Sequence, residues 1–406
     1  MNHHRLYNTS RLLLPLIAIL LMWCPGRVCG EIRAGYITCT PGNEVYELEG
    51  HAALRLVDEE NGVDMVVNWG VFDFAAPAFV WRFALGETDY MAIAVPTRFF
   101  VDAYTAQHRQ VIEQSLNLTP LQASRLAGLV ADAIRPENRV YRYRYAHDNC
   151  ATRPLGYIER AIGDTVIFHD PIPSPATTLR EEMRRYHDGY PWYQLGIDIA
   201  LGAPLDDTID VATCGFAPVK MRELLAHATI TADSTGRAVP LVLKETVLNG
   251  KEVNIATEPS RTPIFPTPMT VSIALLVIAA AVMAFDIKRR RRSRLIPAAV
   301  FALQGMAGCV VAFLMVASSH YATDTNYLIL WLNPLALLVP AIVWWRWSVK
   351  TLTVYHVLNI LATLVLCVVF LCGLQSCNTA FVPAMFASMI LSADYLTITH
   401  LLHKQQ

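Results

Sequence analysis

The 406-residue chain is 54% hydrophobic and only 17% charged, whereas a typical soluble domain is about 45–50% apolar and about 25% charged. This composition excludes a disordered chain, a collagen-like fibre and an ordinary cytosolic enzyme. The formal net charge is −1, so no overall positive field attracts nucleic acid. The length predicts two or three structural units, and nine cysteines are too few for a disulfide scaffold.

Residues 1–30 have the pattern of a signal peptide. Arg5 and Arg11 precede an apolar run at 12–23, and small residues follow up to Gly30. Such a segment directs export and is cleaved after its small residues; an uncleaved signal anchor is the alternative. In either case the residues after Gly30 are expected outside the cytoplasm.

Residues 31–262 are predicted to form an exported domain of the α+β class. Strands are expected at 32–40, 52–57, 65–74 and 90–95. Asn61-Gly62 is typical of a hairpin turn between the second and third of these strands. Residues 103–115 fit a strand or a helix, whereas Thr119 and Pro120 predict the start of a helix and a further helix is expected near Cys150. The hairpin precedes the helices, which favours α+β over a doubly wound sheet.

Five apolar runs follow, each long enough for a helix to cross about 30 Å of hydrocarbon. They are residues 269–285, 295–317, 327–345, 352–374 and 379–399. Residues 269–399 are therefore predicted to form an all-α transmembrane bundle of five helices. The Pro-rich segment 263–268 is expected to link this bundle to the exported domain, and 400–406 to form a cytoplasmic tail.

Basic residues predict the orientation of the bundle, because Lys and Arg favour cytoplasmic loops. Residues 288–294 form a basic run between the first and second spans, and Arg346 and Lys350 lie between the third and fourth. The loops at 318–326 and 375–378 contain no Lys or Arg. Residues 31–268 are therefore expected on the outer side of the membrane.

Cys150 and His51 are the strongest candidates for chemistry in the exported domain. Either Asp148 or Asn149 can cap a helix that begins at Cys150, and a thiol in the first helical turn has a lowered pKa. A nucleophilic cysteine also needs a base, and His51 stands at the start of a predicted strand. Gly50 leaves room for another chain or a substrate beside the imidazole. The alternatives are an inert buried cysteine and a solvent-exposed histidine.

The exported domain contains three cysteines, Cys39, Cys150 and Cys214. In an oxidising compartment a Cys39–Cys214 disulfide would leave Cys150 free, although other pairings, or none, stay open. The domain contains no Cys-X-X-Cys pair, so no metal site built from cysteine pairs is expected. His147 is a rival base, but a loop position three residues before a nucleophile rarely points back at it.

A set of motifs in the chain resembles the Lnb family, lipoprotein N-acyltransferases of Bacteroidota membranes. The motifs lie at residues 40–46, 50–55, 68–74, 86–91, 149–152, 179–181, 196–202 with Trp192, and 326–335. They cover most of residues 36–345. One departure is Pro154, which falls where the family pattern has a continuous helix.

The order of His before Cys also resembles the permuted papain-like thiol enzymes, such as lecithin:retinol acyltransferase. The resemblance implies that His51 is the base and Cys150 the nucleophile. It implies an orienting residue on the next strand, for which Asn68 is the first candidate and Asp73 the second. Asp73 and Asn149 are also possible substrate contacts.

The resemblance implies a membrane-bound acyltransferase that uses no cofactor. The acyl donor would be a phospholipid, the intermediate a Cys150 thioester, and the acceptor the N-terminal amine of a diacylated lipoprotein. The expected location is the inner membrane, with residues 31–268 on the periplasmic side.

The membrane half offers three possible substrate contacts, His320, Asn326 and Asn333. Polar residues at membrane depth are costly and often functional, so these side chains are candidates to guide a headgroup or a lipoprotein toward Cys150. The alternative is that Asn333 bonds the helix backbone that Pro334 leaves free.

Two other functions stay open. A thiol hydrolase, such as a cell-wall peptidase, an amidase or a phospholipase, would use the same Cys-His dyad. A non-catalytic membrane scaffold with an exported binding domain would use neither residue for chemistry.

Overall fold

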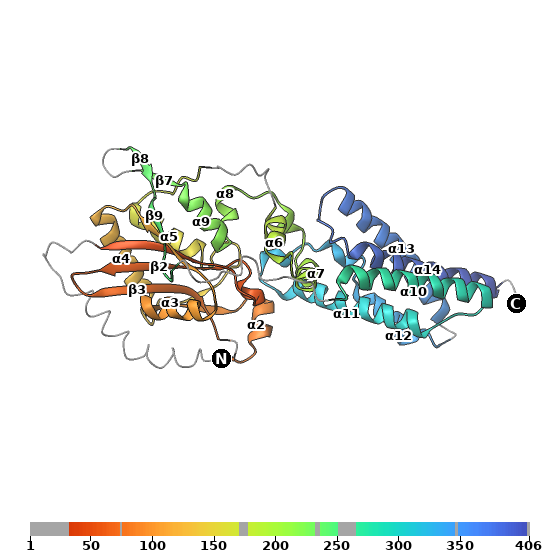
Figure 1. Cartoon of the computed structure of the whole chain (residues 1–406). Helices are drawn as coiled ribbons and strands as arrows, with labels where there is room; N and C mark the ends of the chain where they lie inside the picture. The colour runs from red at the N-terminus through yellow and green to blue at the C-terminus, as the bar shows by residue number, and fades with distance from the viewer. Residues whose placement is uncertain are drawn as a thin grey trace. The chain divides into compact units, whose positions relative to one another are not determined.

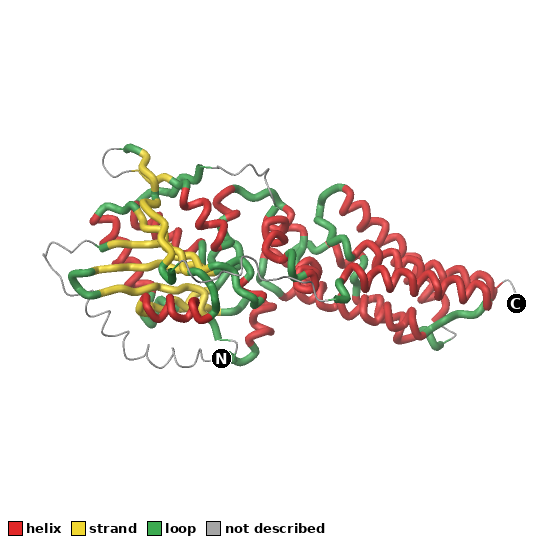
Figure 2. Tube along the Cα trace, in the orientation of Figure 1, coloured by secondary structure: helices red, strands yellow, loops and turns green. Residues whose placement is uncertain are grey.

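The computed structural model describes residues 32–73, 75–169, 178–231, 236–250, 265–345 and 348–403. The predicted signal peptide, residues 263 and 264 of the predicted linker and residues 404–406 of the predicted tail lie outside the described residues. The chain divides into two compact units: the described parts of 1–83, 87–177 and 209–260 form the first, and those of 84–86, 178–208 and 261–406 form the second. The first unit contains the strands, and helices dominate the second (Figure 2).

The first unit is built on an antiparallel seven-stranded sheet with the order β6-β4-β3-β2-β1-β5-β9 (Figure 1). The strands are β1 (Arg33–Cys39), β2 (His51–Asp58), β3 (Val63–Val71), β4 (Asp89–Pro96), β5 (Val111–Leu116), β6 (Val140–Arg142) and β9 (Val242–Val247). A separate ribbon pairs β7 (Thr229–Thr231) with β8 (Ala238–Pro240). The predicted hairpin is confirmed, since Asp58 pairs with Val63 across the turn that contains Asn61-Gly62.

Helices cover both faces of this sheet. They are α2 (Phe79–Leu85), α3 (Thr97–Ala106), α4 (Pro120–Ala133), α5 (Thr152–Ile162), α8 (Val211–Cys214) and α9 (Pro218–Ala226), with a short 3₁₀ turn, η1 (Val45–Glu47). Residues 103–115 contain both predicted alternatives, because α3 ends within them and β5 begins. The predicted start of α4 is confirmed, as the Thr119 side chain caps it and Pro120 is its first residue.

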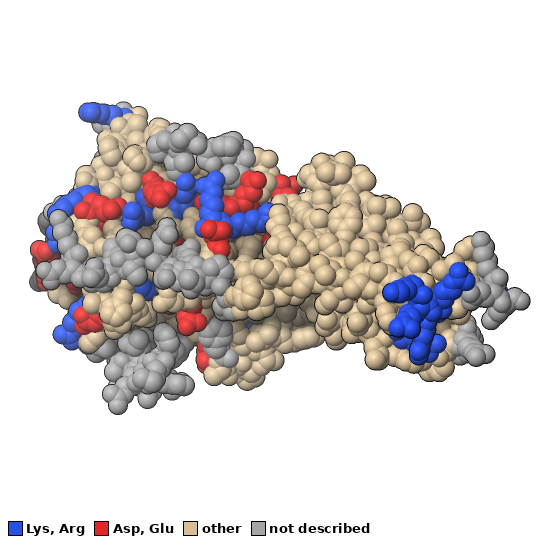
Figure 3. Space-filling model, turned by 45° about the vertical axis from the view of Figure 1, so that its right-hand side comes forward, with Lys and Arg blue, Asp and Glu red and all other residues tan. Residues whose placement is uncertain are grey.

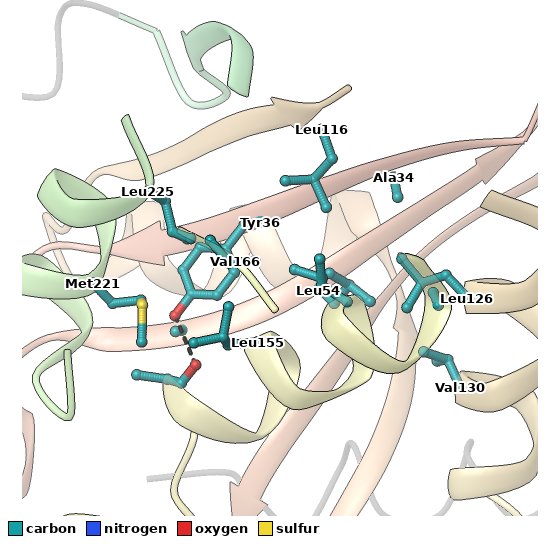
Figure 4. Close-up of a cluster of buried hydrophobic side chains, with 14 of the residues drawn as sticks. Ala34, Tyr36, Leu54, Leu116, Leu126, Val130, Leu155, Val166, Met221 and Leu225 are labelled. Carbon is teal, nitrogen blue, oxygen red and sulfur yellow. Dashed lines mark hydrogen bonds between the residues drawn. The ribbon is translucent and has the colours of Figure 1, made fainter. Parts of the chain in front are cut away.

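Successive strand residues point to opposite faces, so the sheet has a core on each side. One core contains Tyr36 and Leu54 from the strands and Leu126 and Leu155 from α4 and α5 (Figure 4). The other core contains Ile37, Ala53, Val66, Val111 and, from α3, Phe100. Because both faces are covered, functional groups can meet solvent only at the ends and edges of the sheet.

In the second unit, a buried arginine joins the helices α6 (Leu179–His187) and α7 (Pro191–Ala200) to the 3₁₀ turn η2 (Ala203–Asp206). Arg180 pairs with Asp198 and Asp206, each at 2.9 Å. Asp198 also accepts a hydrogen bond from Asn378, in the loop between two membrane helices. Residues 178–208 therefore pack with the membrane part of the chain.

Within the part of the chain that the structure describes, four helices are long and apolar enough to cross a membrane. They are α10 (Pro268–Arg289), α11 (Leu295–Ala317), α13 (Val349–Leu371) and α14 (Phe381–His403). Figure 3 shows an uncharged surface over the helical part, with a group of basic side chains at one end. In the basic run at the end of α10 and in the loop after it, Lys288 to Arg291 and Arg294 are exposed.

The third predicted span, 327–345, is not one straight helix. It is broken into the 3₁₀ turns η4 (Tyr327–Leu330) and η5 (Pro334–Leu337) and the short α12 (Leu338–Ile342), after an earlier turn, η3 (Tyr321–Thr323). The chain bends by 48° between the stretches Tyr321–Leu330 and Pro334–Ile342. Asn333 is extended and Pro334 has no N–H to donate, so the helix cannot continue through them. The bundle therefore has four long helices, and five spans if this broken pair is one of them.

Candidate active site

His51 is the first residue of β2, and Gly50 gives the chain its path into the strand. Gly50 has a φ of +84°, and a Cβ on it would lie 2.6 Å from the carbonyl oxygen of Cys39. Cys39 lies directly opposite His51 on β1. The room that Gly50 leaves is therefore filled by another strand, one of the two predicted alternatives.

The imidazole of His51 is held by Asn68 from the neighbouring strand. Nε2 of His51 lies 2.6 Å from Oδ1 of Asn68. An amide oxygen only accepts hydrogen bonds, so Nε2 carries the proton and Nδ1 keeps a lone pair. Burial lowers the pKa of His51 to about 4, the Asn68 bond opposes this shift, and the charge of Arg109 adds to it. His51 is therefore a neutral imidazole at neutral pH.

Cys150 lies in a turn just before α5, because the helix begins at Thr152 rather than at the cysteine as predicted. The Oδ1 atom of Asn149 accepts from the N–H groups of Ala151 and Thr152, at 2.8 and 3.0 Å. Asn149 therefore caps the start of the helix, as one of the two predicted caps. Pro154 stands in the first turn, where an N–H has no partner within the helix, so α5 continues through it.

The amide of Asn149 is fully used inside the protein. Its Nδ2 atom donates to the carbonyl oxygens of Tyr145 and Phe216, at 2.6 and 2.8 Å, and the side chain is buried. Tyr36 adds a bond from its hydroxyl to the carbonyl oxygen of Ala151, at 3.1 Å, from within the core (Figure 4). These bonds fix the turn that carries Cys150, so Asn149 acts on the thiol by position and not as an open substrate contact.

Three hydrogen-bond donors converge on the sulfur of Cys150. They are the backbone N–H of Ala52, the hydroxyl of Tyr143 and the N–H of Cys150 itself. Burial is the largest influence and raises the pKa of Cys150 to about 11, Glu49 adds to the rise, and the three donors oppose it. Ala52 directly follows His51, so the bond from Ala52 brings the sulfur to the His51 end of β2.

Gly70 lies beside Cys150 and Tyr143 in a backbone conformation that favours glycine. It has a φ of +86°, and a Cβ there would lie 3.5 Å from the Tyr143 ring and 3.6 Å from the Cβ of Cys150. The arrangement is a buried thiol and a neutral imidazole at one end of the sheet, with donors aimed at the sulfur. Such a group of residues can carry out nucleophilic attack by sulfur with proton transfer to a base.

Two family models match the chain. Residues 31–184 match the Lnb N-terminal periplasmic domain, and residues 260–404 match the Lnb transmembrane domain. The chain belongs to the Lnb family. No curated protein and no solved structure matches it. The two Lnb domains identify a multi-pass membrane protein with a periplasmic segment, which is consistent with an enzyme.

The second candidate orienting residue in this Lnb protein, Asp73, has a different task. Asp73 is exposed in the loop after β3, and its carboxylate accepts from the N–H of Ala75 at 2.9 Å. The rival base His147 is exposed in the turn before Asn149. Of the predicted residues, Asn68 bonds to His51, and Cys150 lies at the same end of β2 through its bond from the N–H of Ala52.

The three possible substrate contacts predicted in the membrane half all belong to the second unit. They are His320, Asn326 and Asn333. Asn326 is buried, accepts from the N–H of Leu328 and from Gln375, and donates to the carbonyl oxygen of Ile199. Asn333 donates to the carbonyl oxygens of Trp331 and Leu330, at 3.2 and 3.5 Å. Leu330 lies four residues before Pro334, so the bond to its carbonyl corresponds to the predicted structural alternative for Asn333. His320 precedes η3, and its N–H bonds to Ser318.

The cysteines of the first unit are free thiols. Cys39 and Cys150 are buried, Cys214 is partly exposed, and none of the three forms a disulfide. The predicted Cys39–Cys214 disulfide is therefore absent, while Cys150 is a free thiol as that scheme required.

Sequence reasoning missed Tyr143 as a partner of the sulfur. The only signal was the alternation of Tyr141, Tyr143 and Tyr145 with Arg142 and Arg144. Both arginines are exposed and the tyrosines are partly buried, so the tyrosines face inward. That alternation places Tyr143 on the inner face but does not say what it touches.

Proposed function

We propose that this Lnb family member is an inner-membrane lipoprotein N-acyltransferase. It takes an acyl chain from a phospholipid, holds it as a thioester on Cys150, and passes it to the N-terminal amine of a diacylated lipoprotein. The observation that carries the proposal is the placement of the Cys150 sulfur beside Ala52, directly after His51, with His51 held by Asn68. The order of His on a strand before Cys at a helix start also fits a permuted papain-like thiol enzyme.

The first half-reaction forms the thioester. The sulfur of Cys150 attacks the ester carbonyl carbon of the phospholipid while Nδ1 of His51 accepts the thiol proton. The C–O bond of the ester then breaks, and the leaving lysophospholipid oxygen takes that proton from His51. Cys150 ends as an acyl thioester, and His51 returns to the neutral form.

The second half-reaction forms the amide. The neutral amine of the lipoprotein attacks the thioester carbonyl carbon, and His51 accepts one proton from the nitrogen. The C–S bond breaks, and the sulfur of Cys150 regains a proton from His51. The products are an N-acylated lipoprotein and the free thiol, so the protein needs no oxidant or metal for this cycle.

The donors around the sulfur suit the charge that develops on the carbonyl oxygen. Asn149 already occupies the N–H groups of Ala151 and Thr152, so these amides are not open to an oxyanion. The Ala52 N–H and the Tyr143 hydroxyl face the sulfur instead. Once the sulfur is acylated, these two donors are the best placed to stabilise a tetrahedral oxyanion.

The membrane part explains how an amine competes with water. Both substrates carry lipid chains, and the spanning helices anchor the protein in the same bilayer as these chains, which raises the effective concentration of the substrates. The buried surroundings of Cys150 also limit the access of water to the thioester.

The direct test uses purified full-length protein in phospholipid vesicles with a synthetic diacylglyceryl-cysteine peptide. Mass spectrometry is expected to show peptide with one added acyl chain on its α-amine. Cys150→Ser and His51→Ala should abolish this product while the protein keeps its thermal stability. Free fatty acid without acylated peptide would refute the transferase and favour a phospholipase that uses the same dyad.

A further inference from the structure

Helix α2 presents an apolar surface on the first unit. Val80, Trp81 and Phe83 are 78%, 56% and 51% exposed. The one basic residue of the helix, Arg82, is turned away, because it bonds to the carbonyl oxygen of Glu87 and to Asp89, both at 3.0 Å. An exposed apolar patch on a short helix marks a surface that contacts an apolar partner.

Residues Ala84–Gly86, at the end of α2, belong to the second unit, and within that unit Leu85 bonds to a residue just beyond a membrane span. The last residue of α2, Leu85, accepts at its carbonyl oxygen from the N–H and from the hydroxyl of Ser319, each at 2.9 Å. Ser319 lies two residues beyond α11, which ends at Ala317. The basic run 288–294 lies at the opposite end of α11 and is expected on the cytoplasmic side. Leu85 is therefore expected at the outer surface of the bilayer.

A chain of rings leads from α2 to the thiol. We define the aromatic ladder as Phe83, Phe79, Phe72, Tyr90 and Tyr143. Successive ring centroids lie 6.3, 5.5, 5.1 and 4.3 Å apart. At its inner end, the Tyr143 hydroxyl bonds to the sulfur of Cys150. The ladder is purely hydrocarbon at its outer end and carries two hydroxyls at its inner end.

We propose that α2 is a lipid-docking element and that the aromatic ladder guides the acyl chain of the phospholipid donor to Cys150. Val80, Trp81 and Phe83 enter the apolar layer of the outer leaflet. The hydrocarbon tail lies along the phenyl rings, and the ester carbonyl meets the hydroxyls beside the sulfur. An acyl chain fits because it offers only apolar surface until its carbonyl. This inference rests on the proposed function, since it names the route by which the donor reaches the same thiol.

Photocrosslinking tests the docking without any need for acyl transfer. Full-length protein with benzoylphenylalanine at position 81 or 83 is placed in vesicles of phosphatidylethanolamine and phosphatidylglycerol and irradiated. Mass spectrometry should detect phospholipid acyl chains attached at both positions. The control is position 121, because Leu121 is 70% exposed on α4 and has no place in the ladder. No lipid adduct at 81 and 83, or equal yields at all three positions, would overturn the proposal.

Kinetics test the route to the thiol. In the double variant Trp81→Asp with Phe83→Asp, acylation of Cys150 by vesicle phospholipid should slow about tenfold or more, because two large side chains no longer enter the apolar layer. Acylation by a water-soluble short-chain ester should fall much less, and Leu121→Asp should behave as the wild type. Equal losses with both donors would overturn the docking role. Wild-type protein that forms no Cys150 thioester with either donor would refute the proposed function. The crosslinking experiment would still test, independently, whether α2 contacts lipid.

Discussion

Oδ1 of Asn68 lies 2.6 Å from Nε2 of His51, across the pair of strands β2 and β3. Asn68 is the last residue of β3 before the pairing with β4 shifts register between Asn68 and Val71. The irregularity ends the regular ladder where the site begins, as bulges often do next to active sites. In the proposed mechanism this bond leaves Nδ1 of His51 as the proton acceptor.

The role of Asn68 as a positioning residue predicts a loss of rate without a loss of fold. Asn68→Ala should lower kcat/KM for acylation of Cys150 about 10- to 100-fold, the cost of one lost hydrogen bond to the imidazole in the transition state. Single-turnover acylation with a soluble ester measures this effect. An unchanged rate in a folded variant would show that Asn68 does not orient His51.

The pH dependence of acylation distinguishes a neutral pair from an ion pair. With a His51 pKa of about 4 and a Cys150 pKa of about 11, both groups stay neutral between these values. The rate should therefore be nearly flat across neutral pH and fall only in acid, as His51 takes up a proton. A carboxylate beside the ring raises the pKa of a histidine, so Asn68→Asp should move the acid limb to higher pH. A wild-type rate that rises steeply between pH 6 and 8 would contradict the neutral pair.

The hydroxyl of Tyr143 is expected to act in the transition state. Tyr143→Phe should lower kcat for acylation about 10- to 100-fold, somewhat less than the loss of a strong oxyanion donor, while substrate KM changes little. Tyr141→Phe is the matched control, because it removes a hydroxyl from the same face two residues away. If the two variants lose activity equally, the hydroxyl of Tyr143 has no special role.

Loss of the Asn149 side chain is expected to lower both the stability and the activity of the protein. Asn149→Ala removes the cap of α5 and the donor to two carbonyl oxygens, the partly buried one of Tyr145 and the buried one of Phe216. The free energy of unfolding should fall by about 2–4 kcal/mol, as the sum of a lost cap and lost buried bonds. Asn149→Asp keeps the capping oxygen and should recover part of the loss. Thermal unfolding of the full-length protein in detergent measures both, and a variant as stable as the wild type would refute the structural role.

The sequence predicted the local elements of the site better than its surroundings. Residue alternation and turn residues located β1 to β4. The pairing of His51 with Asn68 followed from the resemblance to the permuted papain-like enzymes, which implied an orienting residue on the next strand. Helix α5 begins two residues after the predicted start at Cys150, because the side chain of Asn149 accepts from the N–H groups of Ala151 and Thr152. Tyr143 was missed because its contact with the sulfur depends on the path of the chain after β6.

The membrane half shows why length and hydropathy are not enough to predict a helix. The run 327–345 is apolar and long enough to span a bilayer, yet it breaks at Asn333-Pro334. The packing is tight there, since a Cβ on Gly308 of α11 would lie 2.4 Å from the backbone of Asn333. Likewise, the charged segment 178–208 packs with the membrane helices because Asp198 and Asp206 neutralise the buried Arg180. Such pairings between distant residues leave no periodic trace in the sequence.

The central claim is that Cys150 carries the acyl chain, and one measurement tests it most directly. Full-length protein is incubated in phospholipid vesicles without an acceptor, digested and analysed by mass spectrometry. The account predicts an acyl group on the peptide that contains Cys150, removed by neutral hydroxylamine as a thioester should be, and missing from the His51→Ala variant. An unmodified Cys150, or an equal adduct in the variant, would contradict it.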